Sequence, residues 1–438
     1  MIFWFCLRNR RLGMESYKIK SIIAEIAGGI EDLIGRGVIC TDRKLLLYGL
    51  DRYAFAMRTI LANLGYHNVE GYLSDDEAQV LRCRADMENF SCRFLAQEAG
   101  LLRIWRLEER LEPFDSGVAI LVASKSYGKE KAKLEALGYE EHIHFYSVYD
   151  FRDQELEAFF ADKKKMSLPE IKQAEKEMLA YVDRLCRKHG IRYWVCGGTL
   201  LGTIRHQGFI PWDDDIDIFL PLKDYRKLID LFREKERARE AGYYGMLGFG
   251  TSENNDFADL LAKIVDKRTI VAEDIGTVRK VNPLWIDVFP LVGMPEDPAE
   301  RHLFFAGYRE MNRKMWREFY AANGRVDLFG RWYAKQKEYI SRYDFDGSEY
   351  VGVLGAVYGE RDCTHKRVYA ETLRMPFEDI EVNVPVGYEE YLDILYGAWR
   401  RLPEKHERKT RHDMLVYWNQ AMAYGKGRGN DQYYNAGL

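Results

Sequence analysis

The sequence predicts an α/β protein of two domains, and three observations support this prediction. The chain has 438 residues, more than a single hydrophobic core usually holds. Its first half alternates short apolar runs with helical patterns, as do parallel sheets covered by helices. A strong helix start at Ser167 then opens a stretch of different character, so we place the domain boundary between residues 151 and 167.

The composition excludes several classes of protein. Hydrophobic residues make up 47% and charged residues 31%, as in ordinary globular proteins. Lys and Arg number 65 against 69 Asp and Glu, and this net charge of -4 argues against a general nucleic-acid binder. The seven cysteines contain no Cys-x-x-Cys pair, so we expect reduced thiols and a cytoplasmic location. No uncharged run approaches the ~18 residues that a membrane span needs. Peripheral contact with the inner face of a membrane stays open.

The first domain, residues 17–155, is predicted to hold a parallel sheet. Buried strands are expected over residues 45–50, 69–73, 118–124 and 142–148, and helices over residues 52–64 and 129–137. This order is typical of a Rossmann-like α/β domain. Residues 1–16 are interpreted as an extension of uncertain start, with Met14 as an alternative first residue.

The turn after the first strand lacks a dinucleotide-binding fingerprint. That fingerprint, G-x-G-x-x-G, uses its second glycine to let the backbone approach a pyrophosphate. The sequence has Asp51 at that position and Ala54 at the third glycine position. Because an aspartate there adds bulk and repels the pyrophosphate, we expect no NAD(P) cofactor. We interpret the domain as architectural or as the site of another ligand.

The second domain, residues 167–424, is predicted to begin with a long helix. Ser167 to Glu170 form a capping box with a proline in the first turn. Apolar residues follow at helical spacing, at positions 171, 174, 178, 179, 182, 185 and 186. Gly190 ends the pattern, and a strand over residues 192–196 follows. Residues 425–438 are expected to form a frayed tail.

A candidate phosphate site follows that strand. Gly197 and Gly198 lie between the strand and a predicted helix, so their backbone N–H groups would face a phosphate at the helix N-terminus. Thr199 would cap the helix or offer its hydroxyl to the phosphate.

Three acids form a candidate metal site. Asp215 and Asp217 alternate with isoleucines, so on a strand both would lie on one face. Adjacent carboxylates repel each other unless a cation lies between them, and hard oxygen ligands favour Mg²⁺ or Mn²⁺. Asp287 lies alone in the apolar strand 285–291, where a buried acid without a partner is costly. This layout is that of the α+β polymerase-beta-like nucleotidyltransferase fold.

Other interpretations of these acids stay open from the pattern alone. An EF-hand loop would need glycine and glutamate where the chain has Ile218 and Asp224. A solvated acidic turn would not place isoleucines between its acids. A metal-binding Asp-x-Asp motif also occurs in sugar-nucleotide glycosyltransferases, and Asp287 has a second interpretation as a plain strand-end acid.

The motif GGTLLGTIRHQGFIPWDDDIDI, residues 197–218, resembles the signature of the LicD/fukutin family. The segment WIDVFPL and a later block that contains Tyr391, Tyr396, Trp399 and Pro403 are similar to further parts of the family pattern. The resemblance covers about residues 168–413. The family commonly has an aspartate after Tyr-Gly, where this chain has Ala398.

The resemblance implies a phosphotransferase. Such an enzyme moves a substituted phosphate, for example phosphocholine or ribitol phosphate, from a CDP-linked donor such as CDP-choline to a sugar hydroxyl and releases CMP. The acceptor would be a cell-surface or lipid-linked glycan: teichoic acid, lipopolysaccharide or a capsule precursor. The resemblance implies metal ligands and catalytic residues at Asp215, Asp217 and Asp287. It implies that the donor phosphate is bound by Gly197, Gly198, Thr199 and Arg205.

Two further residues are candidate substrate contacts. Lys263 would neutralise phosphate, although a solvated strand face explains it equally well. His412 lies in a basic run that would meet a nucleotide or an anionic acceptor. The competing functions are a DxD glycosyltransferase, a sugar-activating nucleotidyltransferase and a non-catalytic scaffold of glycan assembly. The three intact acids argue against the scaffold.

Overall fold

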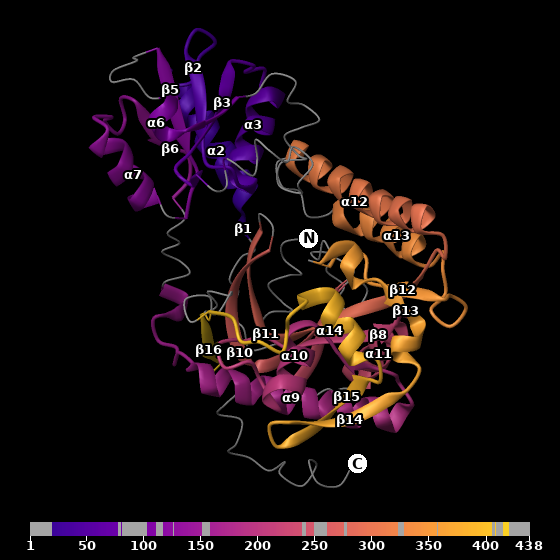
Figure 1. Cartoon of the computed structure of the whole chain (residues 1–438). Coiled ribbons are helices and arrows are strands. Elements are labelled where there is room, and N and C mark those ends of the chain that lie inside the picture. The colour runs from indigo at the N-terminus through magenta and orange to yellow at the C-terminus, as the bar shows by residue number, and fades with distance from the viewer. Residues whose placement is uncertain are drawn as a thin grey trace.

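The computed structural model shows, among the described residues, two large sheets with helices packed on them and a separate two-stranded hairpin (Figure 1). It describes residues 20–77, 80, 103–110, 117–125, 127–150, 158–238, 242–248, 261–275, 278–322, 328–356, 358–404, 408 and 415–419. The predicted extension 1–16, the predicted tail 425–438 and His412 lie outside these residues.

The N-terminal sheet is parallel, in the strand order β4-β3-β2-β5-β6. Its strands are β2 (Lys44–Tyr48), β3 (Val69–Ser74), β4 (Arg103–Arg106), β5 (Val118–Val122) and β6 (Phe145–Ser147). The accompanying helices are α2 (Ile22–Gly35), α3 (Arg52–Asn63), α6 (Leu107–Arg110) and α7 (Tyr127–Ala136). The predicted parallel sheet is confirmed.

Alternation along β2 explains the layers of this sheet. Leu45 and Leu47 pack in one buried cluster with the apolar residues of α2 and α3. Leu46 and Tyr48 pack on the other face with Leu107 of α6 and with α7. Successive side chains of a strand point to opposite faces, so both faces of the sheet are buried.

Two details of this sheet differ from the prediction. Strand β4 and helix α2 were not expected. The strand expected over residues 142–148 is limited to Phe145–Ser147. The reason is a turn: the Glu140 carbonyl accepts the N–H groups of Ile143 and His144, and His142 has a positive φ of 68°.

Asp51 has a local role in this domain. It is the N-cap of α3, and its Oδ1 accepts the N–H groups of Tyr53 at 2.9 Å and of Ala54 at 3.1 Å. These are the first-turn donors that a pyrophosphate would use at a helix N-terminus. The side chain at the second fingerprint position therefore occupies that site itself.

The second sheet is mixed and is built around a long hairpin. The hairpin strands are β10 (Ala262–Ile275) and β11 (Val278–Met294). The main path of the sheet runs β13-β12-β11-β10-β16, with β1 and β8 also on β11, β7 on β8 and β9 on β10. The shorter strands are β1 (Lys20–Ser21), β7 (Trp194–Val195), β8 (Asp217–Pro221), β9 (Tyr244–Leu247), β12 (Tyr350–Gly352), β13 (Thr364–His365) and β16 (Val416–Trp418). Strands β14 (Thr372–Phe377) and β15 (Ile380–Pro385) form a separate hairpin.

The helices of this half follow local signals in the sequence. They are α9 (Leu168–His189), α10 (Gly197–His206), α11 (Leu222–Ala238), α12 (Pro298–Ala321), α13 (Phe329–Ile340) and α14 (Tyr388–Tyr396), with 3-10 turns η2 (Gly359–Asp362) and η3 (Lys366–Tyr369). The limits predicted for α9 are confirmed. The Glu170 carboxylate accepts the N–H and the hydroxyl of Ser167, each at 2.9 Å, and Gly190 ends the helix in the left-handed conformation.

The two halves of the chain share packing. Four side chains of α12 and α13 belong to the same buried cluster as α2, α3 and the N-terminal sheet: Met315, Phe319, Phe329 and Trp332. Figure 1 shows α12 beside α3, and the two helices are in contact. Of the helices in the described ranges, none combines the length and the apolar character that crossing a membrane requires.

Candidate functional site

Asp217 and Asp287 lie side by side on neighbouring strands. β8 and β11 run parallel, and Asp217 is the register partner of Asp287. Directly paired residues on adjacent strands share one face of a sheet, so both carboxylates are on the same face. The backbone N–H of Asp287 donates to the Ile216 carbonyl at 2.9 Å, which fixes this register where β8 begins.

Asp215 completes the acidic group, although it does not lie on a strand as predicted. β8 begins at Asp217, and residues 213–216 have no regular structure. The reason lies in the partner of the Asp217 N–H, which donates to Oγ1 of Thr199 at 2.8 Å and not to a neighbouring strand. Burial, then Asp215 and then Asp287 raise the pKa of Asp217 well above its ordinary value. The two other predicted acids are therefore the charges that act most strongly on Asp217.

Lys263 lies next to this pair. It is the register partner of Asp287 across β10 and β11, and its Nζ is 3.3 Å from Asp287 Oδ1. The ammonium also lies 3.5 Å from the ring centroid of Trp285, and the residue is 5% exposed. The alternative of a solvated strand face is therefore wrong. The structure pairs Lys263 with an acid, and its contact with a phosphate stays a prediction.

The two glycines allow acids to approach the start of α10. Gly197 has a φ of +53°, and a Cβ there would lie 3.4 Å from Asp217 Oδ2. A Cβ on Gly198 would lie 2.7 Å from Asp213 Oδ2, closer than real Cβ contacts. The Gly197 N–H donates to the Tyr391 hydroxyl at 3.4 Å. These glycines thus accommodate carboxylates, and their predicted binding of a donor phosphate stays a prediction.

Thr199 and Arg205 both form hydrogen bonds within the protein that position other residues near the acids. Thr199 is buried, and its hydroxyl accepts the Asp217 N–H, so it positions that aspartate. Arg205 donates from Nη1 to the carbonyls of Trp399 at 2.8 Å and Arg401 at 3.3 Å. Its Nε donates to Nε2 of His206 at 3.0 Å, and burial and then Arg205 lower the pKa of this histidine. Arg205 therefore joins α10 to the segment after α14, and its contact with a phosphate stays a prediction.

The sequence-based reasoning missed a group of hydroxyls behind Gly197. Tyr391 and Tyr396 come from α14, and the Tyr396 hydroxyl accepts that of Tyr358 at 2.9 Å. It also lies 3.9 Å from the position of a Gly197 Cβ. The block around Tyr391 and Tyr396 had indicated a family resemblance without a role for these tyrosines. Tyr391 is buried and Tyr396 half-buried, and their position beside Gly197 follows from the fold and not from the sequence pattern.

Glu175 was also missed. It lies on α9 and is 0% exposed, and neither carboxylate oxygen has a hydrogen-bond partner among the described residues. Burial, then Asp215 and then Asp214 raise its pKa well above its ordinary value. One signal was present in the sequence, because Glu175 lies four residues from both Ile171 and Leu179, on the apolar face of the helix.

The donor chemistry of this group fits a hard cation. Carboxylate oxygens are the preferred ligands of Mg²⁺ and Mn²⁺. Asp287 Oδ1 is buried without a hydrogen-bond partner among the described residues, and so are both oxygens of Glu175. In the same part of the chain, no three His, Cys, Asp or Glu side chains lie close enough to enclose an ion.

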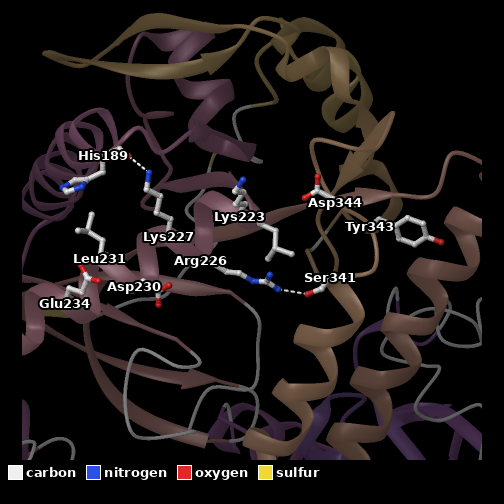
Figure 2. Close-up of a pocket in the computed structure, with 11 residues that line it drawn as sticks. His189, Lys223, Arg226, Lys227, Asp230, Leu231, Glu234, Ser341, Tyr343 and Asp344 are labelled. Atoms are coloured by element: carbon white, nitrogen blue, oxygen red, sulfur yellow. Dashed lines mark hydrogen bonds between the residues drawn. The ribbon is translucent and has the colours of Figure 1, made fainter.

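A separate cavity of about 650 Å³ lies beside α11. Figure 2 shows that Lys227 donates to the His189 carbonyl and Arg226 to the Ser341 hydroxyl. The lining also includes Asp230 and Glu234, so it is mixed in charge. None of the acids of the candidate site lines this cavity. We therefore place the candidate site at Asp215, Asp217 and Asp287 and not in this cavity.

Comparisons with known proteins agree with the family resemblance of the motif at residues 197–218. The family described as "LicD/FKTN/FKRP, nucleotidyltransferase domain" matches residues 190–271, which include the glycines, Asp215, Asp217 and Lys263. The lipopolysaccharide cholinephosphotransferase LicD of Haemophilus influenzae is 27% identical over 274 residues, which cover 58% of this chain and 99% of that protein.

Two human proteins match over shorter stretches. The ribitol 5-phosphate transferase FKRP is 40% identical over 70 residues, which are 16% of this chain and 13% of the relative. The ribitol-5-phosphate transferase FKTN is 30% identical over 83 residues, which are 18% of each. These matches and the paired acids lead to one conclusion: the chain is similar to phosphotransferases of the LicD/fukutin family, whose nucleotidyltransferase domain matches residues 190–271.

Proposed function

We propose that the protein transfers a substituted phosphate from a CDP-linked donor to a hydroxyl of a cell-surface glycan or its precursor and releases CMP. The names of the relatives support this proposal, since they describe cholinephosphate or ribitol-phosphate transfer. Phosphocholine is the first head group to test, because the cholinephosphotransferase matches over 99% of its length. The acceptor class follows the same relative and is a lipopolysaccharide-like glycan.

The observation that carries the proposal is the pairing of Asp217 with Asp287 in register, with Asp215 two residues before Asp217. A bound Mg²⁺ or Mn²⁺ would supply charge stabilisation for a diphosphate at this site. Asp215, Asp217 and Asp287 are the residues that would hold it. The carboxylate chemistry of these three residues, which suits a hard divalent cation, supports this assignment.

The residues of the chain have distinct parts in the reaction. The acceptor oxygen forms a bond to the phosphorus that carries the head group, while the bond from that phosphorus to the CMP oxygen breaks. Asp287 accepts the hydroxyl proton, and Lys263 holds its carboxylate in place from 3.3 Å. Thr199 fixes the backbone of Asp217, and the first turn of α10 faces the charge of the donor.

We also propose the finer fold assignment. The order β4-β3-β2-β5-β6, with the first strand of the sheet at its centre, supports a Rossmann-like class for residues 17–155. The paired acids on β8 and β11 support a polymerase-beta-like class for residues 167–424. Asp51 at the N-terminus of α3 supports the absence of NAD(P) binding. A cytoplasmic location, with access to a lipid-linked acceptor, agrees with a CDP-linked donor.

A product analysis tests the proposal. The full chain is incubated with Mg²⁺, a lipo-oligosaccharide acceptor and, in turn, CDP-choline, CDP-ribitol, CDP-glycerol and CDP-ethanolamine. We expect CMP and a new phosphodiester on the glycan, observed by phosphorus NMR, with one donor preferred. CDP released from a sugar nucleotide would indicate a glycosyltransferase. Pyrophosphate released from CTP would indicate a nucleotidyltransferase, and either result overturns the proposal.

A further inference from the structure

The loop that follows α10, residues 207–212, is held by two segments that lie outside the family match. One is α9, and the other is the tip of the β14–β15 hairpin. Figure 1 shows this hairpin beside α9, and α9 and β15 are in contact. The loop leads directly into Asp213, Asp215 and Asp217. Its anchoring therefore determines where the acidic segment begins.

Lys172 of α9 anchors the end of this loop. Its Nζ donates to the carbonyls of Ile210 and Pro211, each at 3.1 Å. The Ile210 carbonyl also accepts the N–H of Asp213 at 2.9 Å, so these two residues form the ends of a turn with proline in its second position. One ammonium thus fixes two successive carbonyls of the turn that delivers Asp213 to Gly198 at the start of α10.

Glu378 of the hairpin tip anchors the start of the loop. Its Oε1 accepts the Phe209 N–H at 3.0 Å, and its own N–H donates to the Gln207 carbonyl at 2.7 Å. A Cβ on Gly208 would overlap with Oε1, so glycine is needed where the carboxylate lies on the loop. The ring centroids of Phe209 and Phe377 are 4.9 Å apart. The hairpin tip is therefore fitted to the loop by hydrogen bonds and by packing.

The backbone on both sides of this contact is unusual. Gln207 and Glu378 have φ values of 56° and 54°, in the left-handed region that residues with a Cβ rarely adopt. Glycine or asparagine would form such a hairpin turn at lower cost. Glutamate adds a carboxylate that reaches the Phe209 N–H. Its contact with the loop therefore explains the presence of this side chain at position 378.

We propose that Lys172 and Glu378 are positioning residues for the transfer reaction, and that they hold loop 207–212 so that the aspartates after it lie correctly at the start of α10. The inference rests on the proposed function, because it concerns the reaction at the same acids. Neither residue is among those proposed to contact the donor, the acceptor or a metal ion. A loop that is held before the substrate binds needs no reordering during the reaction.

Steady-state kinetics of the full chain test the proposal, with CDP-choline or whichever CDP-linked donor the product analysis prefers. We expect Lys172→Met and Glu378→Ala to lower kcat for CMP release by about 10- to 100-fold, since small displacements of reacting groups have effects of this size. KM for the donor should change by less than about threefold, because neither side chain binds the donor. Lys172→Arg and Glu378→Gln keep a hydrogen-bond donor and an acceptor, respectively, and should recover most of the lost activity.

Each test variant has a matched control on the same element. Lys176→Met removes a lysine one turn further along α9, whose Nζ lies 2.6 Å from the exposed Asp379. Glu381→Ala removes a carboxylate of β15 that lies 3.8 Å from Arg374 Nε and is 67% exposed. Exposed ion pairs contribute little, so we expect both controls to retain the wild-type kcat. An equal loss of kcat in the controls and the test variants would indicate general damage to these elements and overturn the proposal.

Hydrogen exchange separates this inference from the proposed function, because it requires no turnover. Exchange in peptides that cover residues 207–217, measured by mass spectrometry, should become faster in Lys172→Met and Glu378→Ala, while peptides of α11 keep the wild-type rate. If the wild type releases no CMP, the proposed function fails, and faster exchange would still show that both residues hold the loop.

Two results would overturn the positioning role while the wild type still releases CMP. One is an unchanged exchange rate over residues 207–217 in both test variants. The other is a lower melting temperature with an unchanged kcat, which is the result expected of a merely structural contact. In either case Lys172 and Glu378 do not position the acids, and the proposed function stands.

Discussion

Asp217 depends on neighbours from a helix, a strand and the loop before it. Thr199 of α10 accepts its N–H, Asp287 of β11 pairs with it in register, and Asp215 lies two residues before it. Its pKa is raised by burial and by these acids. The carboxylate is thus held in a position that is unfavourable for an isolated charge, which is a frequent property of functional sites.

Replacement of this acid should separate stability from activity. We expect Asp217→Asn and Asp215→Asn to lower CMP release by at least about 100-fold. Both should melt in EDTA at or above the wild-type temperature, because one of two repelling carboxylates has been removed. Asp379→Asn, which changes an exposed partner of Lys176, is the control for activity. If Mn²⁺ raises the melting temperature of both mutants as much as that of the wild type, the ion binds elsewhere.

Asp362 gives a prediction on pH. It is buried, and burial raises its pKa from 3.8 to about 7, against lowering contributions from Arg361 and from hydrogen bonds of Tyr358 and Tyr391. Between pH 4 and 7 the folded state therefore binds more protons than the unfolded state. The free energy of unfolding consequently falls as the pH rises through this window.

Asp362→Asn should remove that pH dependence. Near pH 4 the mutant and the wild type should have similar stability. Above pH 7 the mutant should be more stable by on the order of 2–4 kcal/mol, because it has no carboxyl to ionise in the core. Urea unfolding at pH 4.5, 6 and 8 measures the difference. An equal difference at all three values would contradict the raised pKa.

At the scale of elements, local signals predicted α9 well and the acidic loop less well. The capping box and Gly190 are contiguous with the helix that they limit, so both ends could be predicted. β8 was predicted to include Asp215, but the hydroxyl of Thr199 takes the Asp217 N–H and the strand begins there. That contact joins two elements, and periodicity within either one does not reveal it.

Glu175 and β1 are two further features that depend on contacts between distant segments and could not be predicted from local sequence patterns. An acid on the apolar face of α9 could be read from the sequence, but its complete burial without a hydrogen-bond partner among the described residues depends on the fold around it. The short strand β1 has a partner in β11, far along the chain, and two residues carry too little pattern to be predicted. The paired geometry of Asp217 and Asp287 was inferable because each lies on an apolar strand.

The turn into α10 gives a stability prediction with an internal control. Gly197→Ala should destabilise the protein by about 1–2 kcal/mol, because alanine is disfavoured at a φ of +53°. Gly28→Ala in the middle of α2 should stabilise it by about 0.5–1 kcal/mol, since its Cβ would meet no atom within 4 Å. Thermal melting of both variants measures the opposite signs. A neutral Gly197→Ala would mean that this turn relaxes freely.

On the scale of the whole molecule, the N-terminal sheet depends on the second half of the chain. Its buried cluster includes Met315, Phe319, Phe329 and Trp332 from α12 and α13. Burial of a large apolar side chain contributes about 1.5–3 kcal/mol, and a typical domain has a net stability of only about 5–15 kcal/mol. We therefore expect the N-terminal sheet to lose much of its stability when α12 and α13 are removed.

A fragment of residues 20–160 tests this dependence. We expect it to melt at a lower temperature than the full chain, or without a cooperative transition, and to bind the dye ANS through the uncovered face of α2 and α3. The control is the full chain with Phe319→Ala, which should be destabilised by about 3–5 kcal/mol but remain folded. A fragment as stable as the full chain would show that the shared cluster adds little. NAD(H) binding should accordingly be titrated with the full chain, where we expect none.

The pairing of β1 with β11 has a consequence for biosynthesis. Lys20 pairs with Arg279, so the two halves of this ladder leave the ribosome about 260 residues apart, or roughly 10–50 s at usual elongation rates. The helices that complete the first buried cluster are made later still. During that interval the nascent chain presents apolar helix faces without their native cover. Such surfaces promote association between unfinished chains, and the yield of native protein should therefore rise with added chaperone.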